Sequence, residues 1–369
     1  MARLKNHYGK WQVLYRDPTG RERSAGSFTF KADAQRVQRE VQHQVEVGSW
    51  IDPSLRTTPL RDWAATWIDS RNGLKPKTIE GYRSILNSRV LPRFGDRRLN
   101  EMRTIEVEQW VGDMTAEGLA PASVQRFHQV LNTMLNAAVR SGMIPNNPAE
   151  GVGLPKRPHR EMLFLSPAEI EQLADAIEAP YRPWVFLMAY GGLRWGEAAA
   201  LRRGRIDVLH SRIEVAEATS EVRGKVIFGE TKNRKRRSIA LPTFLRDMLH
   251  EHLLTVADPG ADALVFTTPG GHVLRSSNFR PNVWLDALAR AGLPPRLRIH
   301  DLRHTCVALL ISQGAHPEAI KRHLGHSSIS VTMDRYGHVF PSEADGLAAA
   351  LDGIRSGLTP ESRLLGVVR

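Results

Sequence analysis

Apolar and polar positions alternate twice near the N-terminus, over Lys10–Asp17 and Arg23–Phe30, and the segment Pro18-Thr19-Gly20 lies between the two runs. A period of two predicts strands, and a turn rich in Pro and Gly between two such runs predicts a hairpin or a three-stranded sheet. Residues 31–48 then take up helical spacing and end at a glycine. We therefore expect residues 1–55 to form a small sheet-plus-helix module.

From about position 57 the apolar residues recur every three or four positions, which predicts helices. Helices are expected over Leu60–Arg71, over Lys77–Gly95 and again from Pro121 to Gly142, where Pro145 prevents continuation. The last of these carries its apolar stripe at Val124, Phe127, Leu131, Leu135 and Ala138. Residues 56–152 thus read as an all-α domain of four or five helices.

A basic segment rich in Gly and Pro follows, and residues 153–162 are interpreted as a linker. The next domain, residues 163–342, opens with a capping box in which Ser166 is the N-cap and Glu169 the N3 residue. Helix and strand signals alternate through it. Residues 343–369 are expected to form a short amphipathic helix and a tail. The fold class is accordingly a multidomain, mainly α protein with α+β parts, whose largest domain is mixed α/β.

The net charge of the chain indicates which class of partner it binds. The chain of 369 residues has a formal net charge of +12 and a pI of about 10.2, which favours a polyanion, and nucleic acid before a membrane. A basic surface kept for solubility is the alternative. The longest apolar run, which starts at Trp184, is too short to span a membrane, and the N-terminus lacks the apolar core of a secretory signal. With one cysteine, Cys306, a cytoplasmic location is expected.

Four stretches concentrate reactive side chains. In "YGGLRWGEAAALRRGRID" (Tyr190–Asp207) two glycines interrupt a helix, and Arg194 and Glu197 sit at i and i+3 on the next one. Arg194 lies at a helix start where a phosphate could approach closely. A structural ion pair is an equally weighted interpretation for Glu197.

The second stretch, "IFGETKNRKRRSIALP" (Ile227–Pro242), has strand-like flanks and a strongly basic centre. Lys232 is placed at a strand end, from which it could enter a DNA minor groove. Lys235 and Arg236 are interpreted as a solvated hairpin tip.

The third stretch, "RIHDLRHTCVALLISQG" (Arg298–Gly314), places His300 and Arg303 on one face of a helix. His300 and His304 have the i, i+4 spacing of metal ligands, but no third ligand is evident, so no metal is expected. Cys306 is assigned to the core.

The fourth stretch, "LGHSSISVTMDRYGHV" (Leu324–Val339), turns at Gly325. Ser327 or Ser328 could cap a short helix that carries Ile329, Met333 and Tyr336 on one stripe. Taken alone, Tyr336 reads as a half-buried core tyrosine.

Metal-free phosphoryl transfer on DNA would require two arginines, one lysine, two histidines and one tyrosine. The four stretches together supply such a set. A phenol has a pKa of about 10 and needs a proton acceptor. Guanidiniums can bind the developing phosphate charge, and a lysine can protonate the leaving 5′ oxygen. The covalent phosphotyrosine conserves the bond energy, so no nucleotide cofactor is expected and no Walker A motif is present.

On these four motifs, in this order, the chain resembles the tyrosine recombinases of the phage integrase family. The resemblance makes Tyr336 the nucleophile, Lys232 the general acid and His300 the residue that assists proton transfer. It makes Arg194 and Arg303 the phosphate clamp, and it gives His326 a hydrogen bond to the phosphate. Glu197 and Asp207 would support the site. No cofactor and no metal are implied.

The resemblance also implies an architecture on DNA. Residues 1–55 would bind arm sites and residues 56–152 core sites, while the tail after position 343 would exchange between protomers. A homotetramer would join two double-stranded attachment sites through a Holliday junction, with a host DNA-bending protein and an excision factor, on the nucleoid of a bacterial host. The expected DNA contacts are Lys10, Arg16, Arg21, Arg23, Lys75, Lys77, Arg126 and Arg234.

Other interpretations remain open. A resolvase, an inverting recombinase or the integrase of a conjugative element would share these motifs, and the N-terminal module favours an integrase of a phage or mobile element. A non-catalytic architectural DNA-binding protein would keep the fold without the chemistry. A type IB topoisomerase uses a tyrosine and arginines in a similar way, but the histidine pattern and the N-terminal module argue against this class of enzyme.

Overall fold

The computed structural model describes residues 2–47, 50, 58–158, 162–231, 236–256, 258–325, 328, 330, 333 and 336. The chain divides into two compact units, Met1–Arg160 and Glu161–Arg369, and the division falls inside the segment predicted to be a linker. Each unit has its own buried apolar cluster.

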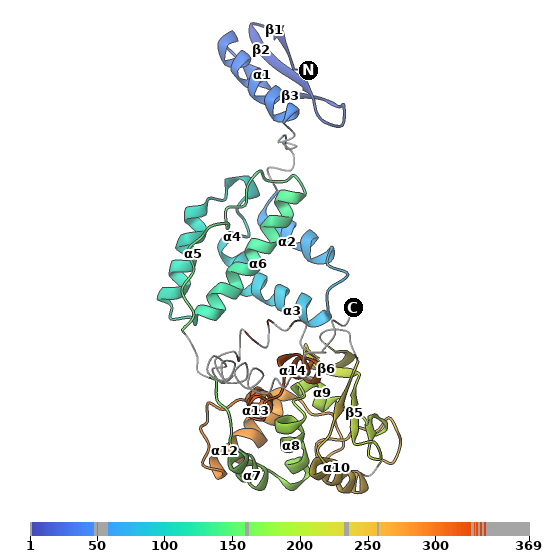
Figure 1. The fold of residues 1–369 in the computed structure, drawn as a ribbon. Coiled ribbons are helices and arrows are strands. Elements are labelled where there is room, and N and C mark those ends of the chain that lie inside the picture. The colour runs from blue at the N-terminus through green and yellow to red at the C-terminus, as the bar shows by residue number, and fades with distance from the viewer. Residues whose placement is uncertain are drawn as a thin grey trace, which may run out of the picture. The chain divides into compact units, whose positions relative to one another are not determined.

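The first unit begins with the predicted sheet and helix. Strands β1 (Arg3–His7), β2 (Lys10–Arg16) and β3 (Glu22–Phe28) form an antiparallel sheet in that order, followed by α1 (Lys31–Glu46). The side chains of Val13 and Tyr15, two residues apart on β2, are both buried, as the alternation predicts. The expectation of a three-stranded sheet with one helix is confirmed (Figure 1).

Helices make up the rest of the first unit, as predicted. They are α2 (Leu60–Asp69), α3 (Pro76–Ile85), α4 (Leu91–Phe94), α5 (Thr104–Ala116) and α6 (Pro121–Arg140), with a short 3₁₀ turn at Leu99–Glu101. A π-helical segment, Leu86–Val90, joins α3 to α4. Pro92 is the second residue of α4, two positions after this segment, and because a proline cannot donate to the i−4 carbonyl, the local widening relieves the break.

The end of α6 is also as predicted. Gly142 takes a left-handed conformation (φ +68°), which an ordinary side chain would disfavour, and the chain turns away three residues before the helix-breaking Pro145.

The second unit mixes helices with two small sheets. Its helices are α7 (Pro167–Ala176), α8 (Arg182–Tyr190), α9 (Trp195–Ala199), α10 (Thr243–Thr255), α11 (Ser276–Phe279), α12 (Leu285–Arg290), α13 (Ile299–Ser312) and α14 (Pro317–Leu324). Short 3₁₀ turns occupy Ala179–Tyr181 and Arg203–Arg205, and a π-helical segment occupies Arg280–Trp284.

Strands β4 (Ile206–Asp207), β5 (Arg212–Val215) and β8 (Arg237–Ala240) form one antiparallel sheet of the second unit. Strands β6 (Glu217–Val222) and β7 (Lys225–Glu230) form a separate hairpin. The mixed α/β architecture predicted for this part of the chain is confirmed.

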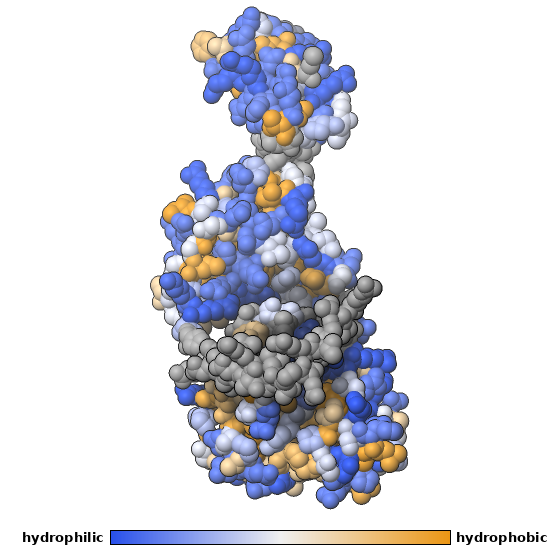
Figure 2. Space-filling view, in the orientation of Figure 1, coloured by the Kyte–Doolittle hydropathy of each residue, from blue (hydrophilic) through white to orange (hydrophobic). Residues whose placement is uncertain are grey.

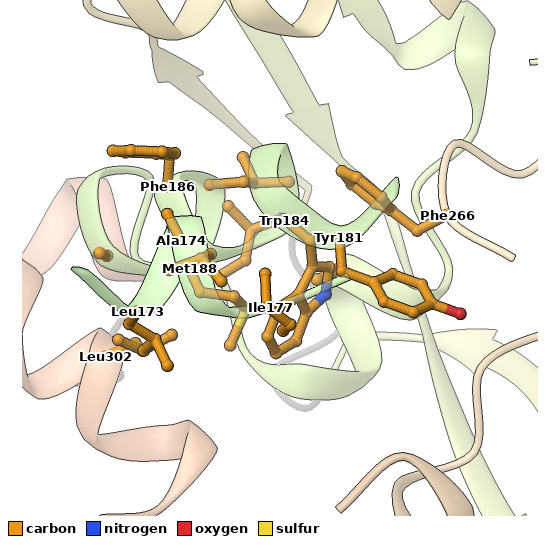
Figure 3. Close-up of a cluster of buried hydrophobic side chains, with 14 of the residues drawn as sticks. Leu173, Ala174, Ile177, Tyr181, Trp184, Phe186, Met188, Phe266 and Leu302 are labelled. Atoms are coloured by element: carbon orange, nitrogen blue, oxygen red, sulfur yellow. The ribbon is translucent and has the colours of Figure 1, made fainter. Parts of the chain in front are cut away.

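The predicted capping box starts this unit. Ser166 accepts a hydrogen bond from the backbone N–H of Glu169 at 3.3 Å, and the Glu169 carboxylate accepts one from the backbone N–H of Ser166 at 2.7 Å. Side chains of α7 and α8 then interdigitate in the main core, where Trp184 and Phe186 are almost fully buried (Figure 3). Leu302 brings α13 into the same cluster, so the helix with the third motif is anchored to the centre of the unit.

Among the described residues, no helix is long and apolar enough to cross a membrane. On the face drawn in Figure 2, hydrophilic residues dominate the first unit, and hydrophobic ones lie in small separate patches.

Candidate active site

The first motif folds as a helix break in front of a short helix. Helix α8 ends at Tyr190, Gly192 takes a left-handed conformation (φ +64°), and Arg194 is the N-cap of α9. A Cβ on Gly192 would lie 2.7 Å from Leu324 and 3.0 Å from the Sγ of Cys306. Glycine is therefore required here both by conformation and because α13 and α14 approach the turn closely.

Glu197 is buried and receives hydrogen bonds from two arginines. Its carboxylate accepts one from the backbone N–H of Arg194 at 2.9 Å and one from the Arg194 guanidinium at 2.8 Å. Arg237, at the start of β8, donates from both terminal nitrogens at 3.1 and 2.7 Å. Burial would raise the pKa of Glu197, but the hydrogen bond and charge of Arg237, followed by the charge of Arg194, outweigh it and lower that pKa to about 2.

Arg303 completes the group of guanidiniums. Its Nη1 lies 3.9 Å from the Glu197 carboxylate and donates to the carbonyl of Gly192, while Nη2 donates to the carbonyl of Leu324 at 2.7 Å. Burial, followed by repulsion from Arg194, lowers the pKa of Arg303 to about 9 against the attraction of Glu197. The side chain stays protonated at neutral pH, so a buried positive charge is fixed beside the helix break.

The start of α13 is held by Asp301, which is buried. Its carboxylate accepts from the backbone N–H of Arg298 at 2.7 Å and from the Arg298 guanidinium at 2.6 Å. This anchors the first turn of the helix. His300 and Arg303 therefore project from a rigid element, at the predicted i, i+3 spacing.

His300 is uncharged at neutral pH. Partial desolvation by the surrounding protein, and then the charges of His304, Arg303 and Arg194, lower the pKa of His300 to about 4. Its ring packs edge-on against that of His304, with 4.8 Å between the ring centroids.

The hydroxyl of Tyr336 is within hydrogen-bonding distance of Nδ1 of His304. Tyr336 has 1% of its surface exposed and packs with Val307, Ile311 and Leu324 of α13 and α14. It is more deeply buried than the half-buried position expected from periodicity.

Two of the predicted catalytic residues, Lys232 and His326, lie outside the described residues. The structure describes Arg194, His300, Arg303 and Tyr336, and α13 links three of them, because Tyr336 meets that helix through His304. Asp207 binds within its own turn: its carboxylate accepts from the backbone N–H of His210 at 2.9 Å, and the His210 ring lies 2.7 Å away. Its side chain is half exposed.

Sequence reasoning missed the placement of Arg237 and of His304. Alternation along β8 carries the signal for Arg237, because it shares a strand face with the fully buried Ile239, two residues on. For His304 the signal is its position one turn beyond His300, two residues before the apolar continuation of the helix from Cys306 to Ile311. Cys306 is buried as predicted, and burial raises the pKa of its thiol to about 12.

A search of the described residues for groups of three or more His, Cys, Asp or Glu side chains able to hold a metal ion finds none. The side chains of this group supply fixed cationic donors, two neighbouring histidines and a phenol.

Comparisons with known families agree with this geometry. Residues 163–343 match the phage integrase family, and residues 59–115 match the N-terminal SAM-like domain of phage integrases. Together the two matches cover more than half of the chain. The chain belongs to the phage integrase family. It is a tyrosine recombinase, a DNA strand-exchange enzyme, as the four motifs indicated.

Curated relatives of this integrase extend the match to nearly its whole length. The prophage phiRv2 integrase of Mycobacterium tuberculosis is 29% identical over 357 residues, covering 93% of this chain and 92% of the relative. The integrase of Mycobacterium phage D29 is 26% identical over 366 residues, covering 95% and 96%.

Solved structures show the same fold. The Tn1549 transposon integrase in complex with transposon right end DNA aligns with a TM-score of 0.71 at 17% identity, covering 81% of this chain and 100% of that one. A lambda integrase dimer bound to a COC′ core site aligns with a TM-score of 0.57 at 20% identity, covering 88% and 91%.

Most of the basic residues expected to contact DNA are exposed in this integrase. Lys10, Arg16 and Arg21 of the N-terminal sheet are on the surface, as are Lys75, Lys77 and Arg126 of the helical part. Arg23 is different, because its Nε donates to the buried carboxylate of Asp17 at 3.0 Å, which ties it to the turn. Arg234 lies outside the described residues.

Proposed function

We propose that this integrase inserts and excises a phage or other mobile DNA element, with Tyr336 as the nucleophile. The observation that carries the proposal is the grouping of Arg194 and Arg303 around the Glu197 carboxylate, on elements that also hold His300 and, through His304, the phenol. Fixed guanidiniums beside a tyrosine suit attack on a phosphodiester and have no obvious purpose in a purely structural core.

In the proposed cleavage step the Tyr336 oxygen forms a bond to the scissile phosphorus, and the bond from phosphorus to the 5′ oxygen breaks. Arg194 and Arg303 bind the non-bridging oxygens as their charge grows. The leaving 5′ oxygen takes a proton from Lys232, and His326 donates a hydrogen bond to the phosphate. The products are a 3′-phosphotyrosine and a free 5′ hydroxyl.

Proton removal from the phenol is assigned to the histidine pair. His304 touches the hydroxyl and is therefore the first acceptor, and the neutral ring of His300 packs against it. His304, one turn along α13 from His300, thus takes part of the role that was expected for His300.

Cleavage also requires Tyr336 to move. A side chain with 1% exposure cannot reach a DNA phosphate, so Tyr336 must become exposed when DNA binds. Its interactions include apolar contacts and the hydrogen bond to His304, which can be exchanged at modest cost.

The proposed assembly on DNA rests on relatives. One lambda integrase structure is a dimer bound to a core site and another is a tetramer bound to a Holliday junction, and we propose the same sequence of states for this chain. Residues 1–55 would bind arm sites and the helical part core sites, on the bacterial nucleoid. A host DNA-bending protein and an excision factor would assist.

The test uses a duplex with a nick placed just 3′ of a candidate cleavage position, so that the short fragment diffuses away after cleavage. The full chain and Tyr336→Phe are incubated with it in chelator, and denaturant-resistant adducts are measured. An adduct from the native chain alone supports the proposal. Equal binding by both proteins with no adduct would contradict the nucleophile assignment and favour an architectural DNA-binding protein.

A further inference from the structure

Arg237 makes contacts that set it apart from the other residues of the basic stretch. Its two terminal nitrogens clamp the Glu197 carboxylate at 3.1 and 2.7 Å, and its Nε donates to the carbonyl of His323 at 3.1 Å. The side chain is 10% exposed, whereas that of the adjacent Arg236 is 71% exposed and lies 3.6 Å from Glu214. The two neighbours are therefore matched in charge and opposite in burial.

The contacts of Arg237 join separate parts of the site. Glu197 belongs to α9, and His323 lies in the last turn of α14, just before the left-handed Gly325. A Cβ on Gly325 would lie 3.0 Å from Cδ of Arg237, so the end of α14 rests closely on this side chain. The carbonyl of Leu324, next to His323, is the one that Arg303 binds. One guanidinium thus fixes the helix end that Arg303 also contacts.

The balance of charges around Glu197 explains why the contacts of Arg237 affect phosphate binding. Three guanidiniums surround one buried carboxylate, so positive charge is left over for an anion. Arg237 satisfies both carboxylate oxygens in a bidentate pair, which is the strongest geometry available to them. The carboxylate already accepts one hydrogen bond from Nη1 of Arg194. If Arg237 were absent, it would be free to draw Arg194 in further and to bind Arg303 directly, so that more of the positive charge needed for phosphate would be neutralised within the protein.

We propose that Arg237 is a positioning residue for strand cleavage: it occupies Glu197 and fixes the end of α14, so that Arg194 and Arg303 present their charge to the scissile phosphate. The inference rests on the proposed function, because it assumes that Arg194 and Arg303 bind that phosphate. Arg237 itself does not contact the reacting atoms.

The experiment measures single-turnover adduct formation at saturating DNA on the nicked duplex, together with DNA affinity and the thermal midpoint. Arg237→Gln is expected to slow cleavage about 10²-fold, the scale of a misplaced catalytic group, with affinity within about twofold of native. The matched control, Arg236→Gln, removes the same charge one residue away and is expected to cleave at the native rate.

A second substitution that restores cleavage distinguishes a positioning role of Arg237 from a purely structural one. In Arg237→Gln with Glu197→Gln, the carboxylate that would capture the other arginines is gone, so cleavage is expected to recover by about tenfold over the single variant. A double variant as slow as the single one, or slower, would overturn the proposal. Native cleavage by Arg237→Gln would also overturn it.

If Arg237→Gln proves unfolded, Arg237→Lys keeps the charge without the bidentate geometry. Slower cleavage with an unchanged thermal midpoint then supports the proposal, and a native rate rejects it. Failure of the proposed function would look different, because the native chain itself would form no adduct.

Discussion

Two buried polar groupings in the second unit are held in different ways. Around Glu197, ionic hydrogen bonds from Arg194 and Arg237 converge on one carboxylate, and Arg303 is fixed by backbone carbonyls. Tyr336, in contrast, is held by a hydrogen bond to His304 and by apolar packing. Charged networks with several partners are rigid and costly to break, whereas contacts of the second kind exchange more easily. The proposed phosphate site is thus preformed, and the proposed nucleophile is the part suited to movement.

The largest effect is expected from a substitution in the rigid network around Glu197. Arg303→Lys keeps the charge but loses the planar fork that binds two carbonyls and would bind phosphate. Adduct formation on the nicked duplex should fall by about 10²–10³-fold, as for loss of a donor to a developing oxyanion. DNA affinity, measured in parallel, should change little. A loss of less than about threefold would show that the fork is not needed.

Stability in acid tests the same network without DNA. Glu197 has a pKa depressed to about 2, so the stability that it contributes is present above its unfolded pKa of about 4.3 and is lost as the pH falls through about 2. Breaking this buried network with Glu197→Gln should cost about 3–5 kcal/mol of unfolding free energy at pH 7. Between pH 4.5 and 2 the difference between native and variant should shrink, as followed by denaturant titration.

The control for that titration is Glu169→Gln, which changes an exposed carboxylate at a helix start. Its effect at pH 7 should be about 0.3–1 kcal/mol, because glutamine can still complete the capping box and only the favourable charge at the helix start is lost. If Glu197→Gln costs no more than this control, the network is not the rigid element described above.

A substitution at His304 tests the contacts that hold Tyr336. His304→Phe removes the contact to the phenol and keeps a ring of similar bulk, so cleavage should slow by about 10²-fold, in the range for a lost proton acceptor. Its companion is the pH profile of the native chain. Because the pKa of His300 is near 4, the cleavage rate between pH 5 and 8 should not follow the protonation of His300. Full activity of His304→Phe would contradict the assignment of the proton to His304.

The smallest effect is expected at Asp207. Asp207→Asn disturbs a half-exposed carboxylate that binds His210 within its own turn. Cleavage should stay within about twofold of native, since surface changes of this kind rarely exceed ~0.5 kcal/mol. A large loss would restore the supporting role that the family resemblance suggested for this residue.

Local signals allowed much of the fold to be predicted from the sequence. The alternating runs of the N-terminal sheet, the capping box at Ser166 and the left-handed Gly142 each follow from chemistry within a few residues. Arg194 at the start of α9 and the i, i+3 pair of His300 and Arg303 could be predicted for the same reason.

Contacts between distant segments could not be predicted in that way. The basic run gives no indication that Arg237 turns inward to Glu197 while Arg236 stays in solvent, because this depends on the register of β8 against β5. Likewise His304, rather than His300, meets Tyr336 through the packing of segments that are 32 residues apart. Asp207 was assigned from resemblance, and its actual partner is three residues away in the sequence.

The most direct test of the account is to map the residue joined to DNA. The adduct formed on the nicked duplex in chelator is digested with protease and nuclease, and the nucleotide-bearing peptide is sequenced by mass spectrometry. If Tyr336 is the nucleophile, we expect a single modified peptide whose added mass, a nucleoside phosphate, lies on Tyr336. Modification at any other residue, or an adduct that forms equally in Tyr336→Phe, would contradict it.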